Sequence, residues 1–332
     1  MGFDRPDLLI IGAGIIGSSI AWHAAGSGLK VRLNDAGTLG GQASSAGAGM
    51  LSPGGEFDQD LWARLAVESL SIYPHYVREL ETEAGFHIDF GVPGSRQYFH
   101  STEEREAAVE RAKRHAALGI RSQLLDDAVL YPDDGFVDPG DVLKALRRSI
   151  ELRGVDLHEN CRLEQVEASE AGAVVIAAGA WSSQIQVRYR SRLIALQESI
   201  PVKGHLIGYR LEPGSLGPMR RYGHTYILQR GSGFTIAGST EQRVGFDRRV
   251  DDTICRDVHE RAAQLWPRLR SETPSERWVG FRPATQDGQI QIGHVSETNV
   301  WLAYGHFRNG ILLAPVTARR IAGEIISSLG KG

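Results

Sequence analysis

The chain has 332 residues, of which 42% are hydrophobic and 23% are charged, a composition typical of soluble globular proteins. This length exceeds the limit at which one hydrophobic core usually suffices, so we expect two domains. A net charge of -3 gives no basic footprint for nucleic acid or for an anionic membrane. No stretch approaches the about 18 uninterrupted apolar residues of a membrane-spanning helix, so we expect neither nucleic acid nor a membrane as a partner.

The two cysteines, Cys161 and Cys255, are far apart and lack the spacing of metal ligands. Isolated cysteines in a long chain are typical of reduced cytosolic proteins, so we expect a cytoplasmic protein without a metal site. Charged residues directly precede the first apolar run, at 8–11, which is unlike a signal peptide.

A strand, a glycine turn, a helix and a second strand follow one another near the N-terminus. Residues 8–11 are continuously apolar, as in a buried parallel strand, and residues 18–25 favour a helix that ends before a second strand at 30–33. Between the first strand and the helix lies a GxGxxG turn, formed by Gly12, Ala13, Gly14, Ile15, Ile16 and Gly17. The turn predicts a dinucleotide site, since its glycines permit a tight bend, close approach of a diphosphate and close helix packing. The helix N-terminus offers N–H groups to the phosphates.

An acidic residue at the end of the second strand strengthens this prediction. Asp35 lies 21 residues after Gly14 and is the candidate partner of the ribose hydroxyls, with Asn34 as the neighbouring alternative. We assign the adjacent Ala36 to the same site. A helix start that uses its glycines only for packing is the alternative interpretation of the turn.

A run of small residues from Gly40 to Leu51 follows the second strand. Small side chains let the backbone lie against a flat, extended ligand and donate N–H groups to it. A flexible linker is the alternative, but a linker would be richer in charge. We therefore add these residues to the cofactor site: Gly41, Gln42, Ala43, Ser44, Gly47, Ala48, Gly49, Met50 and Leu51.

This run resembles the FAD-binding stretch of the D-amino-acid oxidase superfamily of FAD-dependent amine oxidoreductases, and most closely that of its glycine oxidases of the thiamine pathway. The segments 174–182 and 305–315 resemble two further motifs of that family, and the likeness covers nearly the whole chain. The resemblance implies FAD as the cofactor. It adds these residues to the cofactor site: Val166, Ala178, Gly179, Trp181, Arg308, Asn309, Gly310, Ile311 and Leu312.

The C-terminal motif lies between a predicted strand at 300–304 and a predicted amphipathic helix at 311–329. A reduced flavin carries negative charge around N1 and O2, which a helix N-terminus near Asn309 and Gly310 would stabilise. Neither cysteine lies beside the arginine-containing motifs, so we expect non-covalent FAD. The segment 162–174 is shorter than is usual in the family and leaves room only for a tight turn.

The resemblance and the pattern together predict an α/β (α+β) fold of two domains, a Rossmann-like FAD-binding domain and an antiparallel-sheet substrate domain. We expect the strands 8–11, 31–34, 174–177 and 300–304 to share one sheet. The expected FAD-binding domain is discontinuous, comprising 1–85, 140–185 and 276–332. The remainder, 86–139 and 186–275, forms the expected substrate domain, with antiparallel strands near 204–209, 226–230 and 234–238 and a charged helix near 103–118.

Three residues resemble the family's substrate-binding residues. Arg282 matches its carboxylate-binding arginine, Tyr226 the tyrosine that hydrogen-bonds the same carboxylate, and Arg308 a second active-site arginine. An arginine suits this task because its planar fork binds two oxygens at once. A structural ion pair for Arg282 and a cross-strand packing role for Tyr226 are the alternatives.

Three further residues are placed at the rim or wall of the pocket. Met50 is expected to line it, with ordinary packing as the alternative. His306 is expected to be structural, since no pattern pairs it with an orienting carboxylate, and a general-base role is the alternative. Glu241 could favour a cationic portion of the substrate.

We therefore expect an enzyme that oxidatively deaminates glycine or a similar small amine or amino acid. A hydride passes from the α-carbon to flavin N5, and O2 reoxidises the flavin to give hydrogen peroxide. A sarcosine or N-substituted-glycine oxidase and a D-amino-acid dehydrogenase are alternatives of the same class. A flavin-binding subunit of a hetero-oligomer and an NAD-dependent dehydrogenase are alternatives of other classes. The resemblance also implies association into homo-oligomers.

Overall fold

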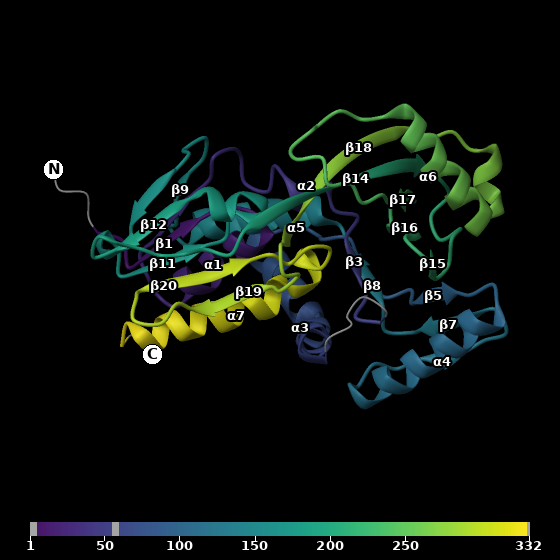
Figure 1. The fold of residues 1–332 in the computed structure, drawn as a ribbon, viewed down its shortest axis with the longest axis horizontal. Helices are drawn as coiled ribbons and strands as arrows, with labels where there is room; N and C mark the ends of the chain where they lie inside the picture. Colours follow the sequence, from purple (N-terminus) through teal and green to yellow (C-terminus); the bar gives the residue numbers. More distant parts are fainter. Residues whose placement is uncertain (1–4, 55–59, 331–332) are drawn as a thin grey trace.

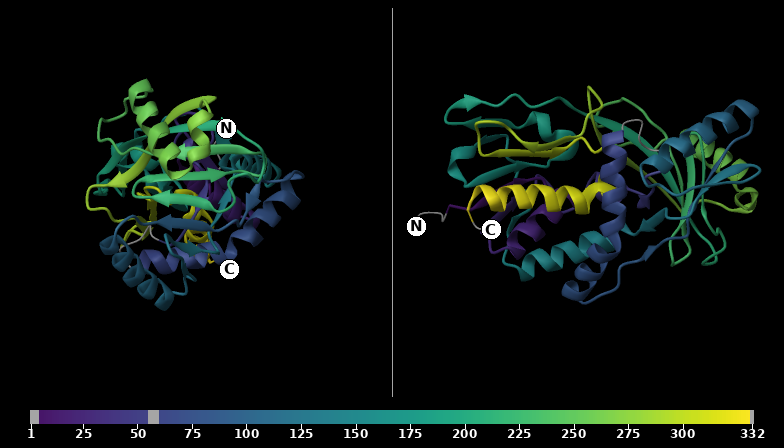
Figure 2. Two further views of the ribbon diagram at one scale, coloured as in Figure 1. Left: turned by 90° about the vertical axis from the view of Figure 1, so that its right-hand side faces the viewer. Right: turned by 90° about the horizontal axis from the view of Figure 1, so that it is seen from below.

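The computed structural model describes residues 5–54 and 60–330. Figure 1 shows two parts, one built on a sheet flanked by α1 and α7 and the other on an eight-stranded sheet with α6 at its outer side. In the second view of Figure 2, α7 runs along the first part and α3 crosses one of its ends. No helix of the described ranges is long and apolar enough to cross a membrane.

The first part contains a six-stranded sheet in the order β19-β20-β11-β1-β2-β9, in which all neighbours are parallel except β19 and β20. Its strands are β1 (Leu8–Ile11), β2 (Val31–Asn34), β9 (Asp156–His158), β11 (Ala173–Ile176), β19 (Gln291–His294) and β20 (Val300–Tyr304). The four strands that the sequence predicted to share a sheet are its central neighbours, β20-β11-β1-β2. That prediction is confirmed.

Alternating side chains of β1 pack into two different cores. Leu8 and Ile10 face a cluster with the helices, whereas Leu9 and Ile11 face a cluster on the opposite side. The helices are α1 (Ile15–Gly26), α3 (Asp60–Ala84), α5 (Pro139–Leu152) and α7 (Gly310–Ser328). The opposite face is covered by a three-stranded sheet of β10 (Gln165–Glu167), β12 (Gln186–Tyr189) and β13 (Arg192–Leu193). The first part is therefore a three-layer arrangement, which explains why its strands are apolar on both faces.

The second part is an eight-stranded sheet in the order β18-β14-β17-β16-β15-β5-β7-β6, antiparallel except for the pair β15 and β5. Its strands are β5 (Ser95–Tyr98), β6 (Gln123–Leu124), β7 (Ala128–Tyr131), β14 (Ser199–Arg210), β15 (Met219–Tyr222), β16 (Thr225–Gln229), β17 (Phe234–Gly238) and β18 (Glu276–Thr285). The helix α6 (Asp252–Leu265) packs on one face, where Ile207 and Ile227 are buried. Their neighbours Leu206 and Tyr226 point to the other face, toward the first part.

Short elements complete the chain. A three-stranded sheet pairs β8 (Gly135–Val137) with β3 (Met50–Leu51) on one side and β4 (Phe90–Gly91) on the other, and so joins the two parts. The remaining helices are α2 (Ala43–Ala46) and α4 (Thr102–Ala117), with 3-10 helices η1 (Ala168–Glu170), η2 (Gly179–Gln184) and η3 (Pro267–Ser271). The turn expected within 162–174 is the single 3-10 turn η1.

Two segments lie in different sheets from those expected of their domain. The strand β18 falls in a range assigned to the FAD-binding domain, yet it pairs with β14 along its whole length, from Ser199 opposite Thr285 to Gly208 opposite Glu276. The hairpin of β12 and β13 falls in the range assigned to the substrate domain, yet its Val187 is buried against the six-stranded sheet. Both placements depend on strand partners remote in sequence.

Candidate active site

A cavity of about 440 Å³ lies between the two parts and extends from the glycine turn after β1 to the strand β18. It opens at the carboxyl ends of β1, β2, β11 and β20, since the residues that follow these strands line it. Ligands of open α/β sheets bind at this edge, and cavities of this size hold small molecules and cofactors.

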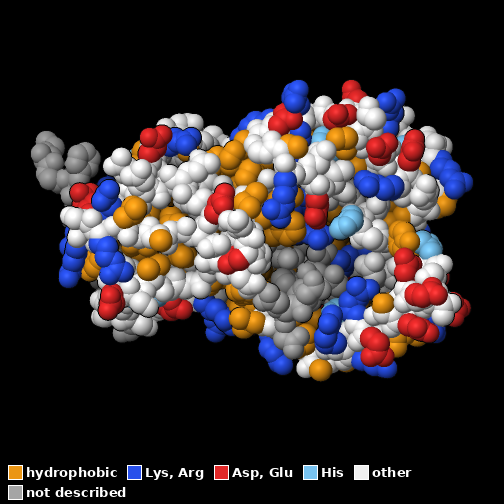
Figure 3. Space-filling model, in the orientation of Figure 1, with side chains coloured by type: hydrophobic (Ala, Val, Ile, Leu, Met, Phe, Trp, Pro, Cys, Tyr) orange, Lys and Arg blue, Asp and Glu red, His pale blue; other side chains and the backbone are white. Residues whose placement is uncertain are grey.

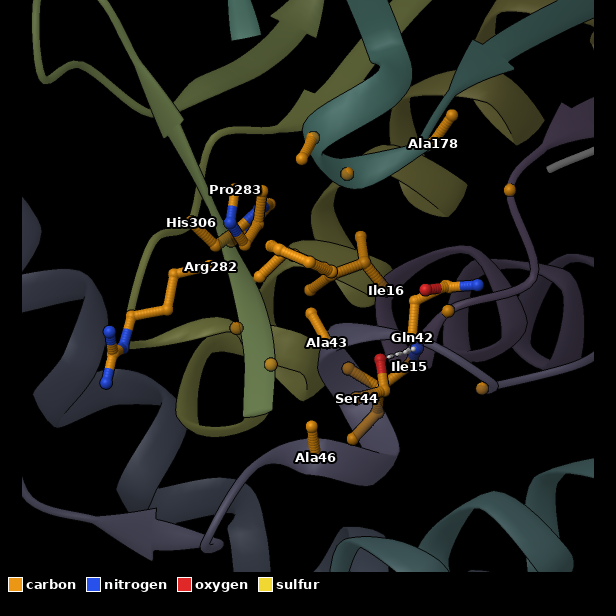
Figure 4. A pocket seen from close by; sticks show the side chains of 18 of the residues that line it. Ile15, Ile16, Gln42, Ala43, Ser44, Ala46, Ala178, Arg282, Pro283 and His306 are labelled. Atoms are coloured by element: carbon orange, nitrogen blue, oxygen red, sulfur yellow. Dashed lines mark hydrogen bonds between the residues drawn. The ribbon is translucent and has the colours of Figure 1, made fainter. Parts of the chain in front are cut away.

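The glycine turn requires glycine at two positions because of close backbone contacts. Gly12 has a φ of 105°, and a Cβ there would lie 2.4 Å from the carbonyl oxygen of Ala177. A Cβ on Gly17 would lie 1.9 Å from the carbonyl oxygen of Gly12. These contacts hold the start of α1 against the ends of β1 and β11. The backbone N–H of Ile15, in the first turn of α1, donates to Ser44 Oγ at 3.0 Å (Figure 4).

The end of β2 presents two polar side chains to the cavity. Asp35 is held in place because its two carboxylate oxygens accept N–H groups from Ala13 and Gly37, each at 2.7 Å. Asn34 is 5% exposed, and its amide donates to Cys161 Sγ at 3.3 Å. Its Oδ1 is buried without a hydrogen-bond partner in the described part of the chain. A buried acceptor without a partner is costly, so this oxygen is suited to accept a hydrogen bond from a bound ligand.

These features fit FAD. The amides at the start of α1 suit its diphosphate, Asp35 and the unsatisfied Asn34 oxygen suit the hydroxyl or amine groups of its adenosine half, and the small-residue segment forms a wall. Most residues predicted for the cofactor do line the cavity: Gly12, Gly14, Ile15, Ile16, Asp35, Ala36, Gly41, Gln42, Ala43, Ser44, Gly47, Ala48, Gly49, Met50, Ala178, Gly179, Trp181, Arg308, Asn309, Gly310 and Ile311.

Five predicted cofactor residues lie behind the wall instead. Ala13 and Gly17 support the turn through the contacts above, whereas Leu51 and Leu312 are buried in the helical core. Val166, on β10, is 7% exposed and packs with the core beneath the sheet. The cavity wall in that region is formed by Cys161 and the three residues after it.

Arg282 reaches the cavity from β18. Its Nη1 donates to the carbonyl oxygen of Thr240 at 2.9 Å and its Nη2 to Ser239 Oγ at 2.6 Å. Gly204, on the neighbouring strand, leaves room for this guanidinium, because a Cβ there would lie 2.5 Å from Arg282 Nη2. Figure 4 shows Arg282 and Gln42 on opposite sides of the site, with their side chains directed away from each other, and both residues line the cavity.

Tyr226, Met50 and Arg308 line the same cavity. Tyr226 lies on β16 opposite Gly238, where an added Cβ would approach the tyrosine Oη to 3.0 Å. Arg308 comes from the turn before α7, and its Nη2 lies 3.4 Å from Glu241 Oε1. The structure therefore brings together four side chains that are up to 258 positions apart in the sequence.

His306 lines the cavity but is only 2% exposed. Its Nε2 lies 3.1 Å from Thr317 Oγ1, inside α7. Burial lowers the pKa of His306 to about 3, so the imidazole is neutral at physiological pH. This geometry agrees with the structural role expected of it.

Sequence reasoning missed several residues of the cavity wall. Residues 161–164 follow β9, and their position after a sheet strand is a signal that could have identified them. Arg248, in the loop before α6, and Phe281, on β18, also line the cavity. No local pattern marks Arg248, because its place depends on the contact between the two parts.

On the face shown in Figure 3, acidic and basic side chains are interspersed over both parts, with no extended patch of one sign. Among the described residues that line the cavity, the charged ones are Asp35, Glu164, Arg162, Arg248, Arg282 and Arg308.

Comparisons with known proteins identify the family. A family model described as FAD dependent oxidoreductase matches residues 7–324. The glycine oxidases of Bacillus licheniformis and Geobacillus kaustophilus are each 30% identical to this chain, over 98% and 96% of it and over 94% and 92% of their own lengths. A crystal structure of the Geobacillus kaustophilus glycine oxidase superposes with a TM-score of 0.89 at 27% identity, covering 97% of this chain and 95% of that one. The chain therefore belongs to the family of FAD-dependent oxidoreductases and, within it, to the glycine oxidase type.

Proposed function

We propose that the protein oxidatively deaminates glycine or a similarly small amine or amino acid, with O2 as the electron acceptor. The amino acid loses a hydride from its α-carbon and a proton from its nitrogen, which leaves the imino acid. O2 takes up the two electrons and two protons and becomes hydrogen peroxide. FAD, when bound, supplies the hydride acceptor at its N5 atom.

The observation that carries the proposal is the convergence of Arg282 and Tyr226 on the same cavity as the glycine turn. A carboxylate bound to the Arg282 guanidinium would be fixed by two parallel hydrogen bonds. Ser239 and Thr240 hold two of the guanidinium nitrogens from one side, so the orientation of the arginine is set before substrate arrives. Positioning of this kind supplies much of the rate of a hydride transfer.

The described residues that line this end of the cavity include His306 as the one histidine, and the reaction needs little acid–base catalysis. The substrate amine must be unprotonated before its α-carbon can release a hydride. The nearby His306 is neutral and hydrogen-bonded to Thr317, so it adds no positive charge that would oppose loss of the hydride. The residues therefore act by binding and orienting the substrate.

The test is a steady-state assay of the purified yellow protein with glycine, sarcosine, N-ethylglycine and D-alanine, with peroxide detection. Turnover of glycine with stoichiometric peroxide supports the proposal. A higher kcat/KM for sarcosine and N-ethylglycine than for glycine would identify N-substituted glycines, and not glycine, as the preferred substrates. Turnover without peroxide, supported by an artificial acceptor, would identify a dehydrogenase.

A second measurement separates an enzyme from a non-autonomous flavin-binding subunit. Under anaerobic conditions, an active protein is bleached by its own substrate because the bound flavin is reduced. If none of the four amines bleaches the flavin, the proposed activity of the isolated chain is wrong.

A further inference from the structure

The loop 241–251, which we call the cover loop, crosses from the eight-stranded sheet to the FAD-binding part. Two side chains make the crossing. Arg248 Nη2 donates to Gln42 Oε1 at 2.8 Å, and Phe246 stacks on Trp181 with ring centroids 4.4 Å apart and an interplanar angle of 18°. Gln42 and Trp181 both belong to the wall of the cofactor cavity. The cover loop is therefore attached to that wall at two points.

Contacts within the second part hold the cover loop in this position. Phe246 meets the edge of Phe281 with centroids 5.6 Å apart, and the Arg248 guanidinium lies 5.6 Å from the centre of the same Phe281 ring. Between them, Asp247 accepts from Lys203 Nζ at 3.2 Å, and the Lys203 side chain is only 4% exposed. A buried lysine requires such a partner, so the pair fixes the middle of the loop.

Arg248 is connected through Gln42 to the segment that contacts the glycine turn. Gln42 lies two residues before Ser44, whose Oγ accepts the Ile15 N–H in the first turn of α1. That helix start is where the FAD diphosphate, with its two negative charges, is expected to bind. Arg248 thus carries its charge to the diphosphate end of the cavity.

The other arginines of the cavity have acidic or substrate-side partners. Arg308 pairs with Glu241, and Arg162 lies 3.4 Å from Glu164. Arg282 contacts residues 239–240 at the substrate end. Arg248 differs, because its partner is a neutral amide and no carboxylate of residues 5–54 and 60–330 is paired with it.

We propose that Arg248 is a cofactor-binding residue contributed by the substrate domain, whose guanidinium offsets the negative charge of the FAD diphosphate. The stack of Phe246 on Trp181 places the cover loop for this contact. FAD is then held from both parts of the molecule, by backbone N–H groups of α1 and by a charged side chain of the cover loop. The inference rests on the FAD dependence of the family and not on which amine is oxidised.

The test is a titration of the apoprotein with FAD in the absence of substrate. Quenching of the flavin fluorescence reports the binding. Arg248→Ala is expected to raise the Kd for FAD about tenfold, as loss of one charge-assisted contact does, and Arg248→Lys by less. Arg243→Ala is the matched control, since it removes the same charge from the same loop at an exposed position. Its Kd is expected to equal that of the wild type.

Ionic strength gives a second readout. Screening weakens an attraction between exposed charges, so the wild-type Kd should rise more steeply with NaCl than that of Arg248→Ala. Phe246→Ala is expected to raise the Kd while keeping the steeper dependence on salt. An unchanged Kd in Arg248→Ala, an equal rise in Arg243→Ala, or identical salt dependence of wild type and Arg248→Ala would overturn the proposal. A urea midpoint of each apoprotein verifies that the variants are folded.

Discussion

Arg308 Nη2 lies 3.4 Å from Glu241 Oε1, and the two residues that precede Glu241 hold Arg282. The segment 239–241 therefore contacts both arginines that the family resemblance assigns to the active site. The Glu241 carboxylate offsets the charge of Arg308, whereas Ser239 and Thr240 offer Arg282 a hydroxyl and a carbonyl oxygen, both neutral. We therefore expect the site to favour a substrate with one carboxylate.

Glu241→Gln should relax this preference for monocarboxylates. The substitution removes the negative charge that offsets Arg308, which should favour a second acidic group on the substrate, as in iminodiacetate. The two side chains are 38% and 33% exposed, so the pair is worth about 1 kcal/mol, or about fivefold in relative kcat/KM. The measurement is the ratio of kcat/KM for iminodiacetate to that for glycine. An unchanged ratio contradicts the assignment, and Glu241→Asp serves as the charge-conserving control.

Arg282→Ala should raise the apparent KM for the amino acid about 100-fold, because a charged partner worth about 3 kcal/mol is lost. FAD should remain bound, since the residues that fit the diphosphate lie at the other end of the cavity. Steady-state kinetics and the flavin absorbance of the same preparation verify both points. Arg282→Lys keeps the charge but not the planar guanidinium, so its apparent KM should lie between those of the wild type and Arg282→Ala. An unchanged KM would show that the carboxylate binds elsewhere.

Gly17 and Gly323 are two helical glycines with opposite surroundings. A Cβ on Gly17 would lie 1.9 Å from a backbone oxygen, whereas one on the exposed Gly323 would meet nothing within 4 Å. Gly17→Ala should destabilise the fold by about 3 kcal/mol and weaken FAD binding, because the turn must move. Gly323→Ala should stabilise it by about 0.5–1 kcal/mol by reducing the entropy of the unfolded chain. Urea unfolding of both apoproteins provides the comparison.

His306 should make stability depend on acidity. Burial lowers its pKa to about 3 from an ordinary value of 6.5, so below pH 6.5 the unfolded chain binds a proton that the folded chain does not. The contribution of the neutral His306 to the free energy of unfolding is fully present above pH 6.5 and is lost as the pH falls from there toward 3. His306→Gln removes this loss, which amounts to about 2 kcal/mol at pH 5. Urea unfolding of both proteins at pH 7 and pH 5 measures the difference, and equal pH dependence would contradict the neutral, buried imidazole.

The parts of the fold that the sequence predicted are those with a strong local pattern. The strand at 8–11, its glycine turn and the helix after it carry their own periodicity and spacing, and the central strands of the six-stranded sheet were identified correctly. The helix predicted at 103–118 is α4, which begins at Thr102 after Ser101 accepts the Glu104 N–H at 3.2 Å. Its capping residue is itself a local signal.

What the sequence did not predict depends on long-range packing. Nothing within residues 276–285 indicates that they pair with β14 and not with the FAD-binding sheet, because either sheet accepts a strand of that pattern. The side chain of Val166 is buried beneath the sheet, and its direction depends on pairing with β12, which no local pattern reveals. Arg248 was missed because its loop has no pattern of its own.

The order of the strands in the six-stranded sheet has a consequence for synthesis of the protein. Among the strands of the described residues, β1 is made before the others and lies between β2 and β11, and β11 lies beside β20, which is made after every strand of the eight-stranded sheet. The helix α7, which packs against α1, comes later still. The six-stranded sheet that carries the glycine turn is therefore incomplete until β20 has been made, so the edge that lines the cavity is assembled late in the translation of the described residues.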